Sequence, residues 1–201
     1  MKLTKLLTAA ATFATLALSA YAADTISLGQ PGYGGTGCPG GSASVTLSPD
    51  KQSLSIIFDS FIVEAGGMTG KRLDRKNCNV AIPVHVPQGM SVSVLNVDYR
   101  GFNDLPSGAM SRFNVEYFFA GTRGPLFTKT FYGPLTQDYD LSNRLDIQAL
   151  VWSPCGADVN LRVNASMMGQ TNRYNEGTLS TVDSADFNAA MVYHLQWKSC
   201  R

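Results

Sequence analysis

The chain has few charged residues and only two histidines, and both shortages limit the classes of function that it can perform. Charged side chains make up 15% of its 201 residues, with 16 Lys and Arg against 15 Asp and Glu. A surface that binds a nucleic-acid duplex needs a basic excess to displace counterions from the phosphates, and this composition has no such excess. The two histidines, His85 and His194, leave few candidates for general acid–base catalysis. We therefore expect no nucleic-acid partner and no histidine-based active site.

Long apolar runs are also scarce, and the extended one lies at the amino terminus. Residues 1–22 begin with two nearby lysines, continue with an apolar stretch from Leu6 to Leu18 and end on Ala20-Tyr21-Ala22. This layout is typical of a cleaved secretory signal, and the apolar stretch is shorter than the roughly 20 residues that span a bilayer. We expect cleavage after residue 22, and a secreted or periplasmic product, residues 23–201, without a membrane span.

The expected mature chain is nearly neutral and fits one domain. Loss of two lysines from the 16 basic side chains leaves 14 against 15 acidic ones, a formal net charge of −1. The one dense basic stretch, Lys71-Arg72-Leu73-Asp74-Arg75-Lys76, is interpreted as a solvated loop, because such runs are usually exposed. The remaining length is enough for a single domain to bury its own core, and no repeat or linker divides it.

What the mature chain does have is alternation of apolar and polar residues with a period of two. In residues 112–120, Phe113, Val115, Tyr117 and Phe119 share one face, as in a strand with one buried side. About nine strands are predicted, at residues 44–47, 53–63, 81–86, 91–97, 112–120, 126–132, 146–152, 159–167 and 190–198. Short strands between turn signals predict an all-β fold, an antiparallel two-sheet β-sandwich of which a jelly roll is one form; an antiparallel barrel is the alternative.

One predicted strand changes the face of its apolar residues partway along. In residues 91–97, Val92 and Val94 share one face, whereas Leu95 and Val97 share the other. An extra residue in the strand re-registers everything that follows it. We therefore expect a β-bulge near Val94, which would bring both pairs to the same buried side.

Four cysteines and the absence of close Cys-x-x-Cys pairs predict disulfides rather than a zinc site. Exported proteins meet an oxidising environment in which disulfides persist. Four cysteines allow three pairings. We favour Cys38 with Cys78 and Cys155 with Cys200, because each bridge then closes a loop of about 40 residues, which the chain-entropy model values at roughly 4 kcal/mol. Neither a metal nor a cofactor is expected.

A series of short motifs runs through nearly the whole mature chain. In order, they are Gly37-Cys38-Pro39, Phe58-Asp59-Ser60-Phe61, Lys76-Asn77-Cys78, Pro87-Gln88-Gly89, Asp98-Tyr99-Arg100-Gly101-Phe102, Phe131-Tyr132-Gly133-Pro134, Trp152-Ser153-Pro154-Cys155-Gly156, Val182-Asp183-Ser184 and Leu195-Gln196-Trp197-Lys198-Ser199-Cys200. Together they resemble the secreted family catalogued as domain of unknown function 4360. The resemblance implies a small exported protein without an established activity, and therefore no catalytic residue. The chain departs from the family pattern at Met90 and at Met167-Met168.

No group of side chains matches a catalytic motif with a known mechanism, so enzyme activity is the less favoured expectation. Each histidine lies between apolar neighbours in an alternating strand, which places it on the opposite face. A glycosidase needs two carboxylates roughly 5 to 10 Å apart, and Asp59, Glu64, Asp98 and Glu116 lie on or beside predicted strands. Asp59 interrupts an apolar run and is expected to face solvent by alternation; the alternative is a buried, paired carboxylate.

The segment Asp98-Tyr99-Arg100-Gly101-Phe102 is the best local candidate for a binding site. An aromatic ring and a planar cation can stack on a sugar face, while the Arg and Asp side chains hydrogen-bond its hydroxyls. Asp98, Tyr99, Arg100 and Phe102 are therefore the predicted ligand-binding residues. The alternative is a strand end at which Asp98 pairs with Arg100 and Gly101 permits a backbone turn.

The function predicted from these features is a secreted, non-enzymatic and monomeric binding protein or envelope or matrix component, with carbohydrate as the first partner to test. One alternative is a carboxylate-dependent hydrolase acting on polysaccharide or cell wall. Another is a secreted inhibitor or effector that binds a further secreted or surface protein, which predicts a large exposed apolar patch. Asn164-Ala165-Ser166 also matches the N-glycosylation pattern, which matters only if the source glycosylates and Asn164 is exposed.

Overall fold

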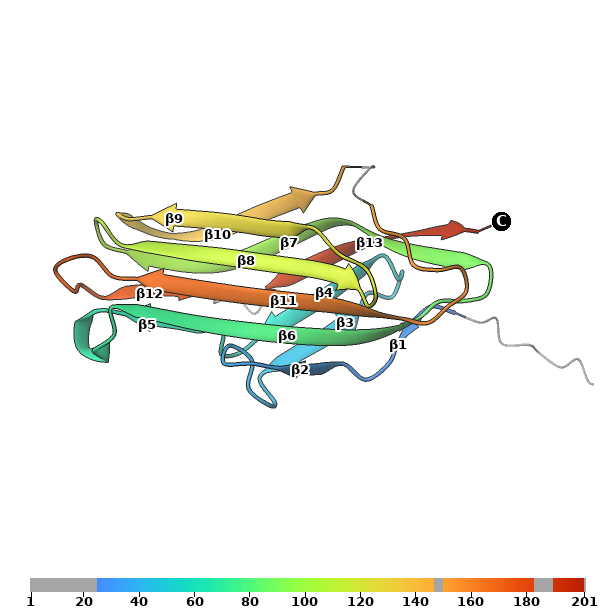
Figure 1. Ribbon diagram of the computed structural model, residues 1–201, viewed down its shortest axis with the longest axis horizontal. Helices are drawn as coiled ribbons and strands as arrows, with labels where there is room; N and C mark the ends of the chain where they lie inside the picture. The colour runs from blue at the N-terminus through green and yellow to red at the C-terminus, as the bar shows by residue number, and fades with distance from the viewer. Residues whose placement is uncertain (1–24, 147–149, 183–189, 201) are drawn as a thin grey trace, which may run out of the picture.

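The computed structural model describes residues 25–146, 150–182 and 190–200. Two antiparallel sheets, of six and seven strands, pack against each other as a β-sandwich (Figure 1). The all-β, two-sheet prediction is confirmed. The predicted signal segment, residues 1–22, lies outside the described residues, as do Asp183 and Ser184 of the family motifs. Within the described ranges, no helix is long and apolar enough to cross a membrane.

The six-stranded sheet has the order β1-β6-β11-β8-β9, with β2 also paired to β6. Its strands are β1 (Ser27–Leu28), β2 (Gly32–Gly34), β6 (Leu73–His85), β8 (Met110–Phe119), β9 (Leu126–Tyr132) and β11 (Val159–Gln170). Long alternating sequences in β6, β8 and β11 turn one apolar side toward the other sheet and one polar side toward solvent.

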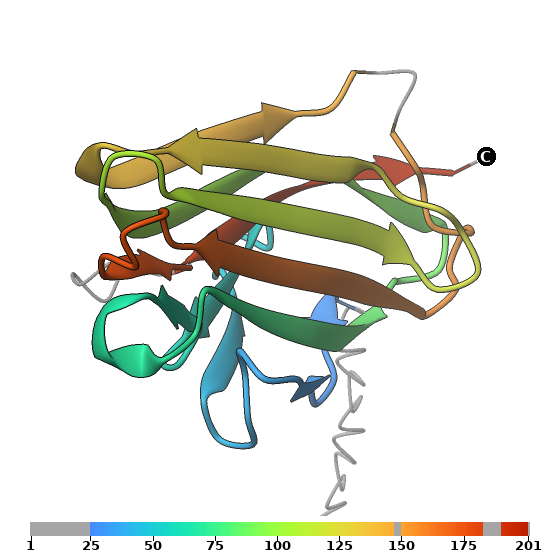
Figure 2. The same cartoon turned by 60° about the vertical axis from the view of Figure 1, so that its left-hand side comes forward.

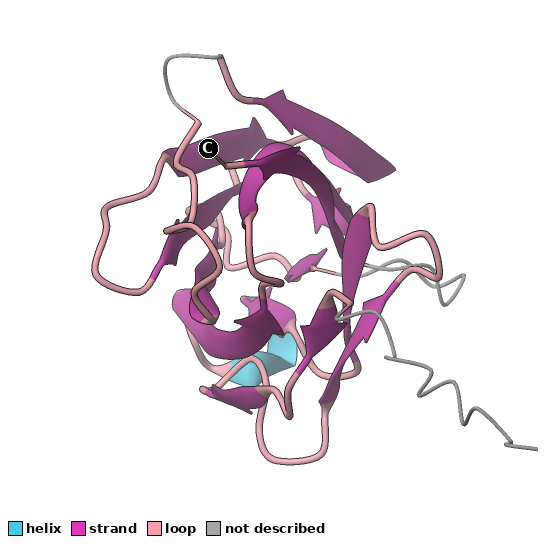
Figure 3. Cartoon of the chain, turned by 90° about the vertical axis from the view of Figure 1, so that its right-hand side faces the viewer, coloured by secondary structure: helices cyan, strands magenta, loops and turns pink. Residues whose placement is uncertain are grey.

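The seven-stranded sheet has the order β3-β4-β13-β7-β12-β5, with β10 also paired to β7. Its strands are β3 (Ala43–Leu47), β4 (Ser53–Phe58), β5 (Ile62–Ala65), β7 (Met90–Leu105), β10 (Leu135–Arg144), β12 (Thr178–Thr181) and β13 (Met191–Ser199). A short 3-10 helix, η1 (Gly67–Thr69), joins β5 to β6 and is the cyan element in Figure 3.

The described residues form thirteen strands rather than about nine. The predicted strand 53–63 is two strands, β4 and β5, because the chain turns at Asp59 and Ser60. β10 is absent from the prediction because Gln137 interrupts the alternation of Leu135, Tyr139 and Leu141. β12 is absent because its buried side chains, Thr178 and Ser180, are polar, and β1 and β2 because they are very short. The predicted strand 146–152 is wrong in its described part, where only Trp152 forms an isolated bridge, to Ser93; residues 147–149 lie outside the described residues.

The core between the sheets is rich in packed aromatic rings. Tyr99 stacks on Phe127 with ring centroids 4.8 Å apart, and Phe113 meets Tyr99 edge-on at 5.3 Å. Tyr117 and Tyr193 make a further edge-on pair at 5.6 Å. Such pairs add roughly 0.5 to 1.5 kcal/mol beyond the area they bury. The two sheets are therefore held in a defined relative position, on which the geometry of the outer faces depends.

The β-bulge expected near Val94 is present in β7. His194 of β13 pairs with Asn96 but the next residue, Leu195, pairs with Val94, so Leu95 is the extra residue. Val92 and Val94 are buried before the bulge, and Val97 and Tyr99 after it. Even-numbered side chains are therefore buried before the bulge, and odd-numbered side chains are buried after it. Every even-numbered side chain from Asn96 to Asp104 consequently lies on the outer face of the sandwich.

Two disulfides join Cys38 to Cys78 and Cys155 to Cys200, the pairing favoured from the sequence. Cys38 and Cys78 are completely buried, and their bond fastens the glycine-rich amino-terminal segment to β6. Cys155 is exposed, and its bond attaches the segment before β11 to the residue that follows β13. The two bonds therefore act on different ends of the described chain.

Candidate functional site

Four side chains of β7 form a line on the outer face of the seven-stranded sheet. They are Asn96, Asp98, Arg100 and Phe102, each half-buried, and we call them the β7 row. Strand alternation separates them from the buried residues between them. Three of the four predicted ligand-binding residues, Asp98, Arg100 and Phe102, are thus brought together on one accessible surface.

Tyr99, the fourth predicted ligand-binding residue, is in the wrong place for that role. It has no exposed surface and stacks on Phe127 inside the core. Burial raises the pKa of its hydroxyl well above the usual range. The same alternation that exposes Asp98 and Arg100 requires the residue between them to point inward. Tyr99 is a core residue, so it is excluded from the candidate site.

Asp98 is the centre of a polar network that connects three strands. Its Oδ2 lies 2.7 Å from Nε2 of His194, and its Oδ1 accepts a hydrogen bond of 3.2 Å from Nδ2 of Asn96. Ser142, opposite Asp98 on β10, donates to Oδ1 of Asn96 at 3.1 Å. Partial burial alone would raise the pKa of Asp98, but hydrogen bonds from His194, Ser142 and Asn96 and the charge of His194 outweigh it and lower that pKa. The carboxylate is therefore held ionised and oriented.

The Asp98 network makes stability depend on pH in a defined direction. Because the folded-state pKa of Asp98 lies below its unfolded value of about 3.9, its contribution is complete above that value and is lost as the pH falls through the folded value. Asp98→Asn is expected to lower the free energy of unfolding at pH 7 by about 0.5 to 1 kcal/mol, a small figure because His194 is 42% exposed. Urea unfolding at pH 7 and pH 3 measures this, and the difference from wild type should shrink at pH 3.

A second Asp–His pair serves as the matched control for that substitution. Oδ1 of Asp158 lies 2.7 Å from Nδ1 of His85, but the Asp158 side chain is 72% exposed. Solvent screens such a pair more strongly, so Asp158→Asn should change stability less than Asp98→Asn. Equal losses for the two variants, or a loss for Asp98→Asn that persists at pH 3, would contradict the assignment.

The other half of the β7 row lies beside carboxylates of β10. Arg100 faces Asp140 across the strand pair, with Nε 3.2 Å from Oδ2, and Phe102 faces Asp138. Asp104 continues the line and accepts a hydrogen bond of 2.7 Å from Thr136. The surface thus combines one aromatic ring, one guanidinium group held by an ion pair, and several carboxylates. A sugar offers matching groups, namely an apolar ring face and hydroxyls that donate and accept hydrogen bonds.

The remaining candidate carboxylates and histidines do not converge with this surface. Asp59 is exposed in the turn after β4, as alternation predicts, and Glu64 is exposed on β5. Glu116 lies on the outer face of the six-stranded sheet, so the sandwich separates it from Asp98. His85 and His194 also belong to different sheets. Across the residues that the structure describes, no group of three or more His, Cys, Asp or Glu side chains is placed to hold a metal ion.

The structure also locates Asn164, the predicted glycosylation residue, and the two residues that pair with Asp98 and Arg100. Asn164 is half-buried on the outer face of β11, between Asn79 and Glu116 on the neighbouring strands. His194 and Asp140, the partners of Asp98 and Arg100, were not identified as such. Alternation of Leu135, Tyr139 and Leu141 was a usable signal for β10, which carries Asp140. The partnership itself requires knowledge of which strands pair.

Comparison with known proteins assigns the chain to a family. A family model described as "Domain of unknown function (DUF4360)" matches residues 24–200. The chain is also 36% identical, over 170 residues, to an "Uncharacterized secreted protein" of Arthroderma benhamiae. That similarity covers 84% of this chain and 69% of the fungal protein. Neither comparison attaches an activity or a ligand to the β7 row.

Proposed function

Because the chain belongs to the secreted family described as domain of unknown function DUF4360, we propose a function from its surface chemistry. It is a non-enzymatic binding protein that holds a carbohydrate on the outer face of β7 and β10. Its place of action is outside the cytoplasm, in keeping with a secreted relative and two disulfides.

The observation that carries the proposal is the joint exposure of Asp98, Arg100 and Phe102 on one strand face. Two of these side chains are already held in place, Asp98 by His194 and Arg100 by Asp140. Polar groups fixed before binding lose little conformational freedom when a ligand arrives. Phe102 supplies an apolar surface next to them, on which one face of a sugar ring can stack.

The state of Asp98 makes it unsuited to the acid role in glycoside hydrolysis. In a glycosidase, the acid carboxyl must keep its proton near neutral pH, which requires a raised pKa. The pKa of Asp98 is instead lowered, because hydrogen bonds and the charge of His194 outweigh partial burial. Asp98 therefore suits the role of a permanent hydrogen-bond acceptor for sugar hydroxyls.

The experiment is thermal unfolding of the oxidised protein with a panel of cell-wall glycans and soluble polysaccharides. A glycan present at about 100 times its dissociation constant stabilises by roughly 2.7 kcal/mol, which raises the melting temperature by roughly 5 to 11 °C for a domain of this size. We expect one glycan class to give such a shift, and Phe102→Ala to abolish it.

Phe118→Ala is the matched control. Phe118 is also a half-buried phenylalanine on an outer strand face, but it lies on β8 in the other sheet. It should keep the glycan-induced shift after correction for any change in intrinsic stability. A panel without a shift, or an equal loss in the Phe118 variant, would refute the proposed site.

A further inference from the structure

One end of the sandwich carries both exposed apolar side chains and a cluster of lysine and arginine residues. It consists of the β5–β6 connection with the start of β6, residues 66–76, and the β11–β12 connection, residues 171–177, and we call it the basic tip. Met68 is fully exposed there, Tyr174 is 67% exposed and Leu73 is 48% exposed. Large apolar side chains gathered at one exposed point mark a surface that contacts something other than water.

The two connections form one firm structure rather than separate loops. The backbone amide of Gly67 donates to the carbonyl of Asn175 at 2.7 Å, and that of Thr171 donates to the carbonyl of Arg72 at 3.0 Å. Nδ2 of Asn172, itself buried, donates to the carbonyl of Ser107 in the β7–β8 turn at 2.9 Å. The two loops lie side by side in Figure 2, with η1 at the bottom of the pair. Met68 and Tyr174 are therefore presented together.

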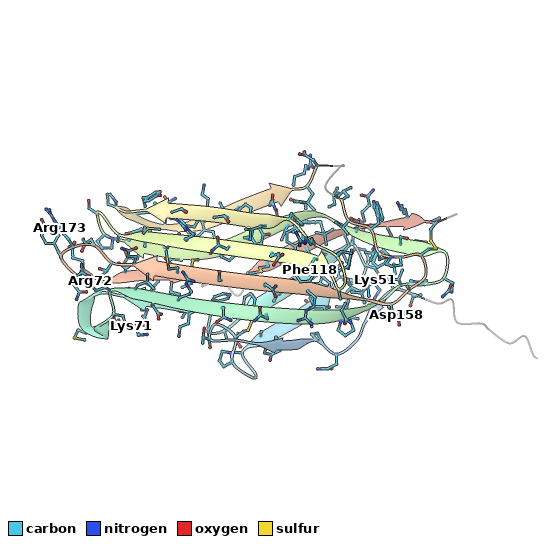
Figure 4. All side chains as sticks on the ribbon, viewed as in Figure 1. Lys51, Lys71, Arg72, Phe118, Asp158 and Arg173 are labelled. Atoms are coloured by element: carbon cyan, nitrogen blue, oxygen red, sulfur yellow. A yellow bond between two sulfur atoms is a disulfide. The ribbon has the colours of Figure 1, made fainter. Side chains whose placement is uncertain are left out.

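Positive charge is concentrated at the same end. Residues 66–76 and 171–177 contain five Lys or Arg and two Asp or Glu, whereas residues 23–201 as a whole contain 14 and 15. The rest of that chain thus has nine basic and 13 acidic side chains. Figure 4 shows Lys71, Arg72 and Arg173 at this end, with Phe118, Lys51 and Asp158 toward the other. The charge distribution gives the near-neutral protein one cationic end.

The carboxylates of the basic tip leave several cations available. Asp74 is paired with Lys71 at 3.1 Å, and Glu176 accepts a hydrogen bond from Asn172. The Arg72 guanidinium donates to the carbonyl of Asn172 at 3.3 Å, and the Arg173 guanidinium lies over the ring of Tyr174, 4.5 Å from its centroid. Among the residues that the structure describes, neither Arg72 nor Arg173 forms an ion pair with a carboxylate. The contacts that they do make hold both guanidinium groups at the basic tip.

We propose that the basic tip docks onto the surface of an anionic phospholipid membrane. Met68 and Tyr174 enter the boundary between headgroups and acyl chains, and Arg72 and Arg173 contact lipid phosphates. Apolar side chains surrounded by cations are the composition by which peripheral proteins bind such surfaces. A soluble polyanion would use the cations but would leave Met68 in water, so the exposed apolar side chains favour the membrane. The tip is separate from the β7 row and serves to hold the protein at a cell surface.

Co-sedimentation with lipid vesicles tests this proposal on the oxidised, secreted form of the protein. Vesicles of phosphatidylcholine mixed with phosphatidylglycerol should sediment the protein, whereas pure phosphatidylcholine vesicles should not. Arg72→Gln with Arg173→Gln is expected to weaken partitioning by about 30-fold, since each cation near an anionic surface contributes roughly fivefold. Met68→Ser is expected to weaken it by about tenfold, because it removes the side chain that enters the interface.

Matched variants at other places on the surface control for general effects. Leu126 is 68% exposed at the start of β9, away from the basic tip, and Leu126→Ser should leave partitioning unchanged. Arg123→Gln with Arg162→Gln removes two exposed cations elsewhere and should change it much less than the tip pair. No sedimentation with the mixed vesicles would overturn the proposal. The proposal would also be overturned if Met68→Ser left vesicle binding unchanged and the protein bound a soluble acidic polysaccharide equally well. That result would identify the tip as a polyanion site.

Discussion

Replacing both Cys38 and Cys78 by alanine is expected to lower the free energy of unfolding by about 4 kcal/mol. The bond joins residues separated by 40 positions, and opening a loop of that length returns conformational entropy to the unfolded chain. Both cysteines are also fully buried, so the substitution removes packed sulfur atoms from the core. For a domain of this size, the melting temperature should fall by roughly 8 to 16 °C, which calorimetry can measure.

The second disulfide provides the comparison that separates the two causes. Cys155 and Cys200 are separated by 45 positions, so the entropy of loop closure is nearly the same. Cys155, however, is exposed, and its removal leaves a smaller packing defect. Cys155→Ala with Cys200→Ala should therefore destabilise less than the first pair. A larger loss for the second pair would contradict the assignment of Cys38 and Cys78 to the core.

Gly101→Ala is expected to destabilise the protein by about 3 kcal/mol. A Cβ atom at this position would lie 2.2 Å from the backbone oxygen of Thr181 and 2.4 Å from the hydroxyl oxygen of Tyr139. Neither group can move away easily, because the Tyr139 hydroxyl donates a 2.7 Å hydrogen bond to that same oxygen. Chemical unfolding should show the loss, and the glycan-induced shift should weaken too, since Gly101 lies between Arg100 and Phe102.

Gly32→Ala is the control for adding a methyl group to a strand. Gly32 lies in β2, and a Cβ atom built there meets nothing within 4 Å. Its substitution should change stability by less than about 1 kcal/mol. A similar small effect at Gly101 would mean that β7 and β10 do not approach as closely as the structure has them. The alternative interpretation of the sequence placed a backbone turn at Gly101, but this glycine lies within β7, where it permits close packing rather than a change of direction.

The candidate site shows which of its features local sequence patterns can predict. Alternation alone places Asp98, Arg100 and Phe102 on one face of a strand, and the same rule assigns Tyr99 to the other face. Inclusion of Tyr99 among the ligand-binding residues overlooked this alternation, which continues along β7 as far as Leu105. The bulge at Leu95 was predictable for the same reason, because it is visible as a change of apolar parity within seven residues.

The sequence by itself determined the all-β class, the likeness to a secreted family, the bulge in β7 and the preferred cysteine pairs. These depend on alternation, composition and short motifs, all of which are local. Only the tertiary structure decided that Asp98 meets His194, 96 residues away, and that Arg100 meets Asp140, 40 residues away. It also decided that Met68 and Tyr174 share one end of the sandwich. Strand pairing sets these contacts, and pairing depends on the packing of the whole core, which no local pattern encodes.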